Sequence, residues 1–246
     1  MKILVCISNV PDTTSKINFT ADNSAFDTNG IQFVINPYDE FSLTKAIKLK
    51  EKMGGTVTVV HVGPATSEPT LRKALAIGAD EAIRIDAVAT DSFFVANELA
   101  AVAKDFDLIM TGRESIDYNG GAVPAMMAEI LELGLINACV GLEINGNDIS
   151  AEREIEGGKE KLSASLPIII AGQKGLVEES ELLIPNMRGI MTARTKPLNV
   201  LTIQANEQRT TSISFEKPEE RAACKIVEAG NEAELVALLH NEAKAI

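Results

Sequence analysis

Short apolar segments with strand character alternate with helical patterns along most of the chain, and this alternation limits the possible folds more than any other feature. Four of these segments are rich in Val, Ile and Leu and cover residues 2–8, 56–62, 107–111 and 167–172. A strand, a helix and a second strand form a βαβ unit, in which the two strands lie parallel and the helix covers one face. We therefore predict an α/β protein with three layers, in which an open, mostly parallel sheet lies between two layers of helices.

Helix start signals support this fold. Asn36 is suited to cap a helix that has Pro37 at its first position and acidic residues in its first turn. Ser67 is suited to cap a second helix, with Pro69 at its second position. Two further helical patterns cover residues 92–104 and 122–133.

The pattern changes near residue 140, and apolar and polar residues alternate over residues 142–167. The pairs Asn145–Gly146 and Gly157–Gly158 interrupt this stretch and are typical of hairpin turns. We therefore expect an antiparallel addition to the sheet. Residues 173–197 follow as a long segment without a regular pattern, rich in charge, Gly and Pro, and such segments are often functional.

The C-terminal part of the chain has the composition of an appended arm. Residues 204–220 are polar and predicted to be extended, and residues 231–245 show the pattern of an amphipathic helix. One side of this helix carries Leu235, Leu238 and Leu239. We divide the chain into an α/β domain over residues 1–203 and an arm over residues 204–246. Such an arm would either fold back on the domain or wrap around a partner subunit.

Charge and cysteine content argue against several classes of protein. The net charge is −12, and no stripe of Lys and Arg is present to neutralise a nucleic acid or an anionic membrane surface. Cys6, Cys139 and Cys224 are too scattered to indicate a zinc or iron–sulfur site, so we expect no metal. The apolar N-terminal run is too short for a signal peptide, and no segment approaches the length of a membrane span. We therefore expect a cytoplasmic protein without membrane insertion.

The chain carries few groups that are suited to acid–base or nucleophilic catalysis. His61 and His240 are its two histidines, and neither lies near a nucleophile motif. His61 falls at the end of an expected strand, where a structural role is the default, and His240 falls on the terminal helix. We therefore expect a protein without catalytic residues of its own.

A glycine-containing loop between an expected strand and an expected helix is the strongest candidate for a binding site. Its sequence, GRESIDYNGGAV, covers residues 112–123. Backbone N–H groups at the end of this loop would point at an anion at the helix N-terminus. The residues concerned are Gly120, Gly121, Ala122 and Val123. Glycine lets a phosphate approach the main chain because it has no Cβ. The pattern is also compatible with a glycine turn that only begins a helix.

Other segments are expected at the same edge of the sheet, because ligands of open parallel sheets bind beyond the carboxyl ends of the strands. Residues 36–39 (NPYD) and 62–64 (VGP) are expected near this edge, and Cys6 and Ser8 would form a floor for the base of a nucleotide. For Cys6, ordinary packing within the strand is an equally good explanation. Taken together, the segments predict nucleotide binding on a sheet of the adenine-nucleotide-binding type.

The segment AEREIEGGKEKLSASLPIIIA, residues 151–171, is similar along its whole length to the signature of the electron-transfer flavoprotein β subunit. Four other stretches resemble further blocks of the same family: NPYDEFSLTKAIKLKE, VGPATSEPTLRKALAIGADEAIRI, DLIMTGRESID and IPNMRGIMTARTKP. The resemblance runs from residue 1 to about residue 200 and, more weakly, through the arm.

This resemblance implies a heterodimer that carries electrons from flavin dehydrogenases, such as the acyl-CoA dehydrogenases of fatty acid oxidation, to a quinone oxidoreductase. The family's α subunit holds the redox-active FAD. Its β subunit holds a structural AMP, or a second FAD in complexes that bifurcate electrons. Carried over to this chain, the nucleotide site comprises Cys6, Asn36, Pro37, Tyr38, Asp39, Val62, Gly112, Arg113, Ser115, Asp117, Gly120, Gly121, Ala122 and Val123. Many family members have Asn, Gln and Thr side chains at the end of the loop, so phosphate binding here would rest mostly on backbone N–H groups.

The last of these stretches, IPNMRGIMTARTKP, resembles the family's recognition loop, which projects an apolar residue, commonly Leu, into a pocket on the dehydrogenase. Met187 stands at the matching position, with Arg188 and Ile190 beside it. A flexible Met suits a surface that docks several partners. A Met tucked under its own loop is the alternative. For the whole chain, a stand-alone adenine-nucleotide-binding or -cleaving domain is a second hypothesis, but it gives residues 173–197 and the arm no evident use.

Overall fold

The structure is a computed structural model that describes residues 1–89, 91–204, 207–219 and 223–246. The described residues form a nine-stranded sheet in the order β11-β5-β4-β1-β6-β10-β7-β8-β9. The strands from β11 to β7 are parallel, and β8 and β9 continue the sheet as antiparallel strands. Their bounds are β1 (Lys2–Cys6), β4 (Thr56–Val62), β5 (Glu81–Ile85), β6 (Leu108–Gly112), β7 (Gly134–Asn145), β8 (Asp148–Ile155), β9 (Gly158–Ser165), β10 (Ile168–Gly172) and β11 (Leu198–Leu201). The predicted open, mostly parallel sheet is confirmed.

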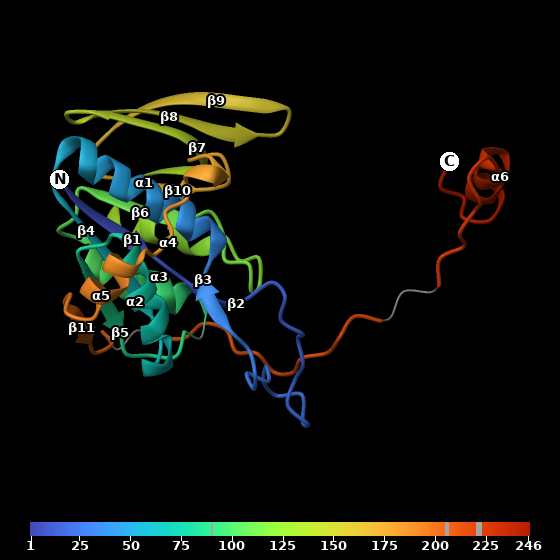
Figure 1. The fold of residues 1–246 in the computed structure, drawn as a ribbon, viewed down its shortest axis with the longest axis horizontal. Helices are drawn as coiled ribbons and strands as arrows, with labels where there is room; N and C mark the ends of the chain where they lie inside the picture. Colours follow the sequence, from blue (N-terminus) through green and yellow to red (C-terminus); the bar gives the residue numbers. More distant parts are fainter. Residues whose placement is uncertain (90, 205–206, 220–222) are drawn as a thin grey trace.

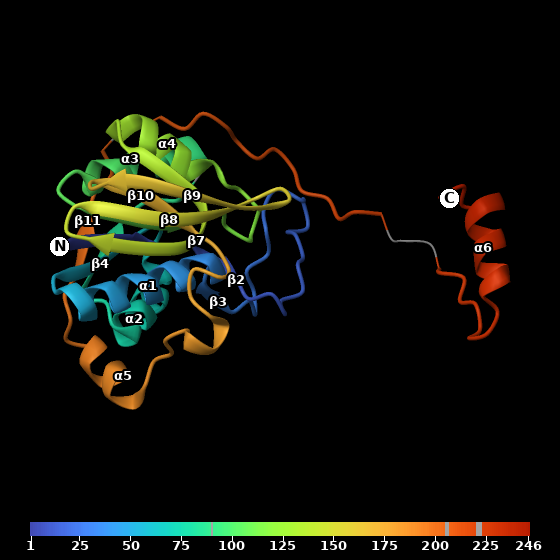
Figure 2. The ribbon, with the colours of Figure 1, turned by 90° about the horizontal axis from the view of Figure 1, so that it is seen from above.

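Helices cover both faces of the sheet, so the predicted three layers are also confirmed (Figure 1, Figure 2). On one face lie α1 (Pro37–Met53) and α2 (Glu68–Ile77), and on the other lie α3 (Ser92–Ala103) and α4 (Ala122–Leu131). A 3-10 turn, η1 (Ala65–Ser67), leads into α2. The carboxyl ends of β1, β4 and β6 therefore meet at one edge, between the two helical layers.

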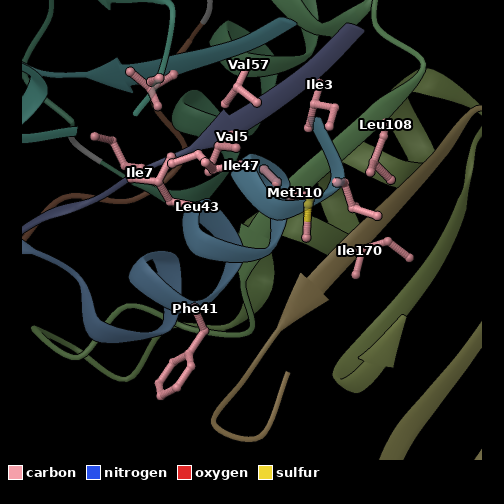
Figure 3. Packing of buried hydrophobic residues seen from close by; sticks show 14 of the residues in the cluster. Ile3, Val5, Ile7, Phe41, Leu43, Ile47, Val57, Leu108, Met110 and Ile170 are labelled. Atoms are coloured by element: carbon pink, nitrogen blue, oxygen red, sulfur yellow. The ribbon is translucent and has the colours of Figure 1, made fainter. Parts of the chain in front are cut away.

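The core is divided between the two faces because successive residues of a strand point to opposite sides of the sheet. Ile3 packs toward α1 and α2, whereas its neighbour Leu4 packs with Phe94 of α3 and Met127 of α4. Figure 3 shows the first of these clusters, in which Leu43 of α1 belongs to the same buried group as the strand residues. Central strands that are buried on both faces explain the continuous apolar runs in the sequence. They give the edge a rigid base.

The predicted antiparallel addition is present as β8, β9 and the second half of β7, which pairs with β8. Its two turns differ slightly from the predicted pairs. The first turn is formed by Gly146 and Asn147, and the second by Glu156 and Gly157. Gly146 has a φ of 63° and Gly157 a φ of 83°, which is the left-handed conformation that glycine adopts most easily. Gly158, assigned to the second turn from the sequence, instead begins β9.

Four of the described strands were not predicted from the sequence. The three-residue strands β2 (Asn9–Pro11) and β3 (Phe33–Ile35) form a small antiparallel sheet and are too short to show a pattern. The strand β5 carries Glu81 and Arg84 among its five residues, and Arg84 is buried, which is unusual for a charged side chain. The strand β11 consists of four mostly exposed residues that follow a segment without regular pattern.

The prediction of an irregular segment over residues 173–197 was wrong in part. This segment contains a 3-10 turn, η2 (Glu179–Glu181), and a short helix, α5 (Met187–Ala193). The Asn186 side chain caps α5 by accepting a hydrogen bond of 2.8 Å from the backbone N–H of Gly189. This is the capping role that Asn favours, so the signal was present in the sequence.

The terminal helix is shorter than the predicted 231–245 and ends at Asn241. This helix, α6 (Glu232–Asn241), lies apart from the α/β body at the end of the arm (Figure 1, Figure 2). Its Leu235 is 44% exposed, so its apolar side is not covered by the body of this chain.

Candidate nucleotide-binding site

A cavity of about 450 Å³ lies at the carboxyl ends of β1, β4 and β6. This is the edge at which open parallel sheets bind their ligands. The cavity also reaches the N-terminal ends of α3 and α4. Eight of the residues predicted for a nucleotide site line it: Cys6, Asp39, Val62, Gly112, Ser115, Asp117, Gly120 and Val123. The six others lie outside the lining: Asn36, Pro37, Tyr38, Arg113, Gly121 and Ala122.

Asn36 does not line the cavity, but its side chain holds the glycine loop (residues 112–123) in place. It stands at the N-cap position of α1, as predicted, but its side chain makes no capping hydrogen bond. Its Nδ2 instead donates to the carbonyl of Glu114 at 2.8 Å, and its Oδ1 accepts from the N–H of Ile116 at 3.2 Å. The predicted position of Asn36 at the start of the helix is confirmed, but the predicted capping by its side chain was wrong. Asn36 is fully buried, and it ties the start of α1 to the loop.

Ser67 departs from its predicted capping role in the same way. It occupies the N-cap position of α2, but its hydroxyl donates to the carbonyl of Pro64 at 2.7 Å and does not cap the helix. The bond closes the 3-10 turn that precedes α2. A local turn partner thus competes successfully with the helix for this hydroxyl.

Asp39 joins the ends of two neighbouring strands. Its carboxyl accepts hydrogen bonds of 2.7 Å from the backbone N–H of Ser8, beyond β1, and of Gly112, the last residue of β6. Burial raises the pKa of Asp39 to about 7 and outweighs the hydrogen bonds from Ser8, Asn36 and Gly112, which lower it. The side chain therefore serves as an internal brace of the sheet edge and gives the cavity a polar wall.

Arg113 braces the other side of the loop. Its guanidinium donates to Oε1 of Gln173 at 3.0 Å and to Oε2 of Glu114, with an N–O distance of 3.0 Å, and lies 5.9 Å from the centre of the Tyr38 ring. Gln173 contacts Glu154 of β8 in turn. Arg113 and Tyr38 thus form an outer layer that connects the hairpin to the loop.

Gly120 and Gly121 lead from the loop into α4. The loop is closed by a hydrogen bond of 3.1 Å from the N–H of Ser115 to the carbonyl of Gly120. Gly121 takes the N-cap position of α4, and Ala122 and Val123 begin the helix. The first N–H groups of a helix have no partners within it, and the helix dipole favours an anion there. This end of the cavity therefore has the features that favour an anion.

The acidic side chains at the cavity are all engaged by donors from this chain, which limits their repulsion of an anion. Asp117 accepts from the Ser115 hydroxyl at 2.6 Å, and Asp91 accepts from the N–H of Phe94 at 2.7 Å. Asp39 accepts from the N–H groups of Ser8 and Gly112, and Glu114 accepts from the guanidinium of Arg113. Within the described part of the chain, no Lys or Arg side chain lines the cavity. An anion would therefore be bound by backbone N–H and hydroxyl groups.

The floor of the cavity is electrically neutral. Burial raises the pKa of the Cys6 thiol, so it stays protonated. His61, which the sequence analysis assigned a structural role, also lines the cavity. Its Nδ1 donates to the carbonyl of Ile7 at 2.9 Å, and burial lowers its pKa, with a smaller effect from Arg84. The protonated Cys6 thiol is a poor nucleophile, and the lowered pKa makes His61 a weaker base.

Further residues at the cavity were not predicted. They come from the start of α3 and from the arm, and include Asp91, Ser92, Thr210 and Ser212. Asp91 has the sequence signal of a helix cap, which it is, but no local pattern connects it to the arm. In the described ranges no group of three or more His, Cys, Asp or Glu side chains is placed to hold a metal ion. No helix built from described residues is long and apolar enough to cross a membrane.

Comparison with known proteins identifies the family. A family model described as the electron transfer flavoprotein domain matches residues 24–206. The electron transfer flavoprotein subunit beta of Bacillus subtilis is 37% identical over an alignment of 262 residues that covers all of both chains. The chain belongs to the electron-transfer flavoprotein β-subunit family. The resemblance carried by residues 151–171 is thereby confirmed.

Two further relatives are also similar to most of the chain. The electron transfer flavoprotein subunit beta of Syntrophomonas wolfei is 36% identical over 91% of this chain and 88% of its own. Protein FixA of Azotobacter vinelandii is 36% identical over 72% of this chain and 67% of its own.

The segment that resembles the recognition loop of electron-transfer flavoprotein β subunits contains the exposed helix α5, which is held against α2. Met187 begins α5 and is 76% exposed, and Ile190 is 45% exposed, so Met187 is not tucked under its own segment. Gly189 approaches α2 so closely that a Cβ there would lie 2.2 Å from the carbonyl oxygen of Ala76. Arg72 of α2 donates to the carbonyl of Ala193 at 2.8 Å. The apolar side chains are thus presented on a fixed base.

Proposed function

We propose that the chain is the nucleotide-holding and dehydrogenase-docking subunit of a heterodimeric electron carrier. A partner α subunit would hold the redox-active FAD, accept electrons from flavin dehydrogenases such as acyl-CoA dehydrogenases, and pass them to a quinone oxidoreductase. The observation that carries the proposal is the cavity at the carboxyl edge of the sheet, which offers an apolar floor, engaged carboxyls and an open helix N-terminus. These features suit tight retention of a nucleotide better than its conversion.

AMP fits this cavity better than FAD. A volume of about 450 Å³ lies toward the lower end of the range of small-molecule sites. FAD contains the AMP half plus a second half that carries the flavin, and it would need correspondingly more room. Val62, Val95 and Leu99 supply apolar surface for a base, and the N-terminus of α4 supplies N–H groups for a phosphate. We therefore assign AMP to this subunit and reserve FAD for its partner.

An electron carrier without catalytic residues of its own agrees with the chemistry of the cavity. Cleavage of a nucleotide needs a nucleophile or a general base beside the phosphate. Cys6 is held neutral by burial, and burial also lowers the pKa of His61, which makes it a weaker base. Asp39 is committed to two backbone N–H groups. These commitments favour a structural nucleotide over the hypothesis of a stand-alone nucleotide-cleaving domain.

The arm supports a heterodimer. Leu235 and Val236 of α6 are 44% and 54% exposed, and α6 lies away from the body of the chain (Figure 2). Apolar side chains gathered on a helix that its own chain does not cover are typical of an interaction site. We assign this helix to contact with the α subunit.

Electron transfer in the assembled complex tests this function. The chain is co-purified with its α subunit and mixed with an acyl-CoA dehydrogenase and its acyl-CoA substrate, while the absorbance of the FAD is followed. We expect the FAD to be reduced at a rate that depends on the dehydrogenase concentration. A complex that retains FAD but is not reduced by any of the acyl-CoA dehydrogenases tried would contradict the proposed electron donor.

A further inference from the structure

The C-terminal arm crosses the nucleotide cavity before it leaves the α/β body. Thr210 and Ser212 line the cavity, although they follow the last strand of the sheet and belong to the arm. Asp91 and Ser92, at the start of α3, also line the cavity, and Asp91 contacts the arm directly. The arm therefore forms part of the cavity wall as well as a connection to α6.

Several contacts hold the arm at this position. The carboxyl of Asp91 accepts hydrogen bonds from the backbone N–H of Thr210, at 2.7 Å, and of Arg209. The guanidinium of Arg209 lies 4.2 Å from the centre of the Phe93 ring, within the range of a cation–π contact. Asp91 is also the side-chain cap of α3, so its carboxyl is fixed independently of the arm. The body side of this anchor is thus fixed within the α/β body.

The arm is held a second time a few residues further along the chain. Phe215 stacks on Phe19, with 5.3 Å between the ring centres, and the Nζ of Lys217 donates to Oδ1 of Asn18 at 2.8 Å. The arm is therefore held on both sides of Ser212, which lines the cavity. Within the described part of the chain, the hydroxyls of Thr210 and Ser212 make no hydrogen bond, so both are free to turn toward a bound molecule.

We infer that Thr210 and Ser212 belong to the nucleotide site, and that the arm is a strap over the bound nucleotide. The inference rests on the proposed nucleotide function and adds two ligand contacts to it, from hydroxyls to polar groups of the nucleotide on the α3 side of the cavity. It also predicts a coupling. If the nucleotide is bound partly by the arm, occupancy of the cavity holds the arm down, and a correctly placed arm strengthens nucleotide binding by the same free energy.

Nucleotide exchange in the co-purified complex tests the two contacts. The dissociation rate of AMP is measured by exchange against excess labelled AMP, for the unmodified complex and for the double variant Thr210→Val and Ser212→Ala. We expect the rate to rise about fivefold for each lost hydroxyl, or roughly 25-fold together, as for two neutral hydrogen bonds. Ser214→Ala, which removes a hydroxyl from the same arm at a position outside the cavity lining, is the matched control and should leave the rate unchanged.

Limited trypsin digestion tests the coupling. AMP should slow cleavage after Arg209, next to the cavity, and leave cleavage after Lys225 unaffected. If AMP is bound but the double variant exchanges it like the control, or Arg209 is cut equally fast with and without AMP, the strap is refuted and the nucleotide site stands. If the unmodified complex binds no AMP, the proposed nucleotide function fails and the strap with it.

Discussion

Gly112→Ala should destabilise the protein and disturb the nucleotide cavity, because position 112 has no room for a methyl group. Gly112 ends β6 at the edge of the sheet and is buried. A Cβ there would lie 2.4 Å from Oδ1 of Asp39, 2.7 Å from the Cβ of Tyr38 and 3.0 Å from Nδ2 of Asn36. Asp39 and Asn36 are both buried and hydrogen-bonded, so neither can move aside without losing its partners.

Two costs add in this variant. Forcing an extra carbon into a packed site costs roughly 1–3 kcal/mol. Moving Asp39 also breaks its bonds to the N–H groups of Ser8 and Gly112, at about 1 kcal/mol each. We therefore expect the free energy of unfolding to fall by about 3–5 kcal/mol, a large part of the stability of a typical domain.

Urea unfolding of the full chain, followed by circular dichroism, measures this loss. Gly120→Ala is the matched control, because Gly120 lies in the same loop and a Cβ there would meet nothing within 4 Å. The control should change the free energy by no more than about 0.5 kcal/mol. Equal stabilities for the two variants would refute the close packing of Gly112 against Asp39 and Asn36.

Three other predictions concern the loop, the docking helix and the buried acid. The Gly121→Val complex should fold but purify without AMP, because a branched side chain would crowd the N-terminus of α4. If AMP is still released when the purified variant is denatured and chromatographed, phosphate binding by the backbone N–H groups of this helix end is contradicted. Met187→Ala should slow electron transfer from the dehydrogenase about tenfold, as for loss of an apolar docking residue, with FAD content unchanged. Met53→Ala is the control, and equal rates for the two variants would exclude Met187 as a docking residue. Since burial raises the pKa of Asp39 from 3.8 to about 7, the folded state keeps a proton in this window that the unfolded state releases. Stability should fall as the pH rises from about 4 to 7, and Asp39→Asn should flatten this profile in urea unfolding at each pH; parallel profiles would refute it.

The sequence was informative where structure is local or repeated. The central strands are buried on both faces, so their apolar runs stand out, and the helix that starts at Pro37 carries its own start signal. The edge of the sheet at which the cavity lies follows from the parallel topology. The glycine loop could be located for the same reason, since it connects a buried strand to a helix N-terminus.

Features that depend on distant partners could not be predicted. Asn36 and Glu114 are 78 residues apart in the sequence, and nothing near Asn36 indicates that its side chain would leave the helix for the loop. The contact between Asp91 and Thr210 spans 119 residues. Short elements such as β2 and β3 form because the end of β1 and the start of α1 bring them together, and three residues carry no pattern of their own.

The nucleotide content of the purified heterodimer tests the assignment of this subunit most directly. The chain is co-expressed with its α subunit, the complex is purified and denatured, and the released nucleotides are separated and counted per heterodimer. We predict one FAD and one AMP. Two FAD would contradict AMP in the cavity of this chain and favour an electron-bifurcating complex, and one FAD without a second nucleotide would contradict the nucleotide site itself.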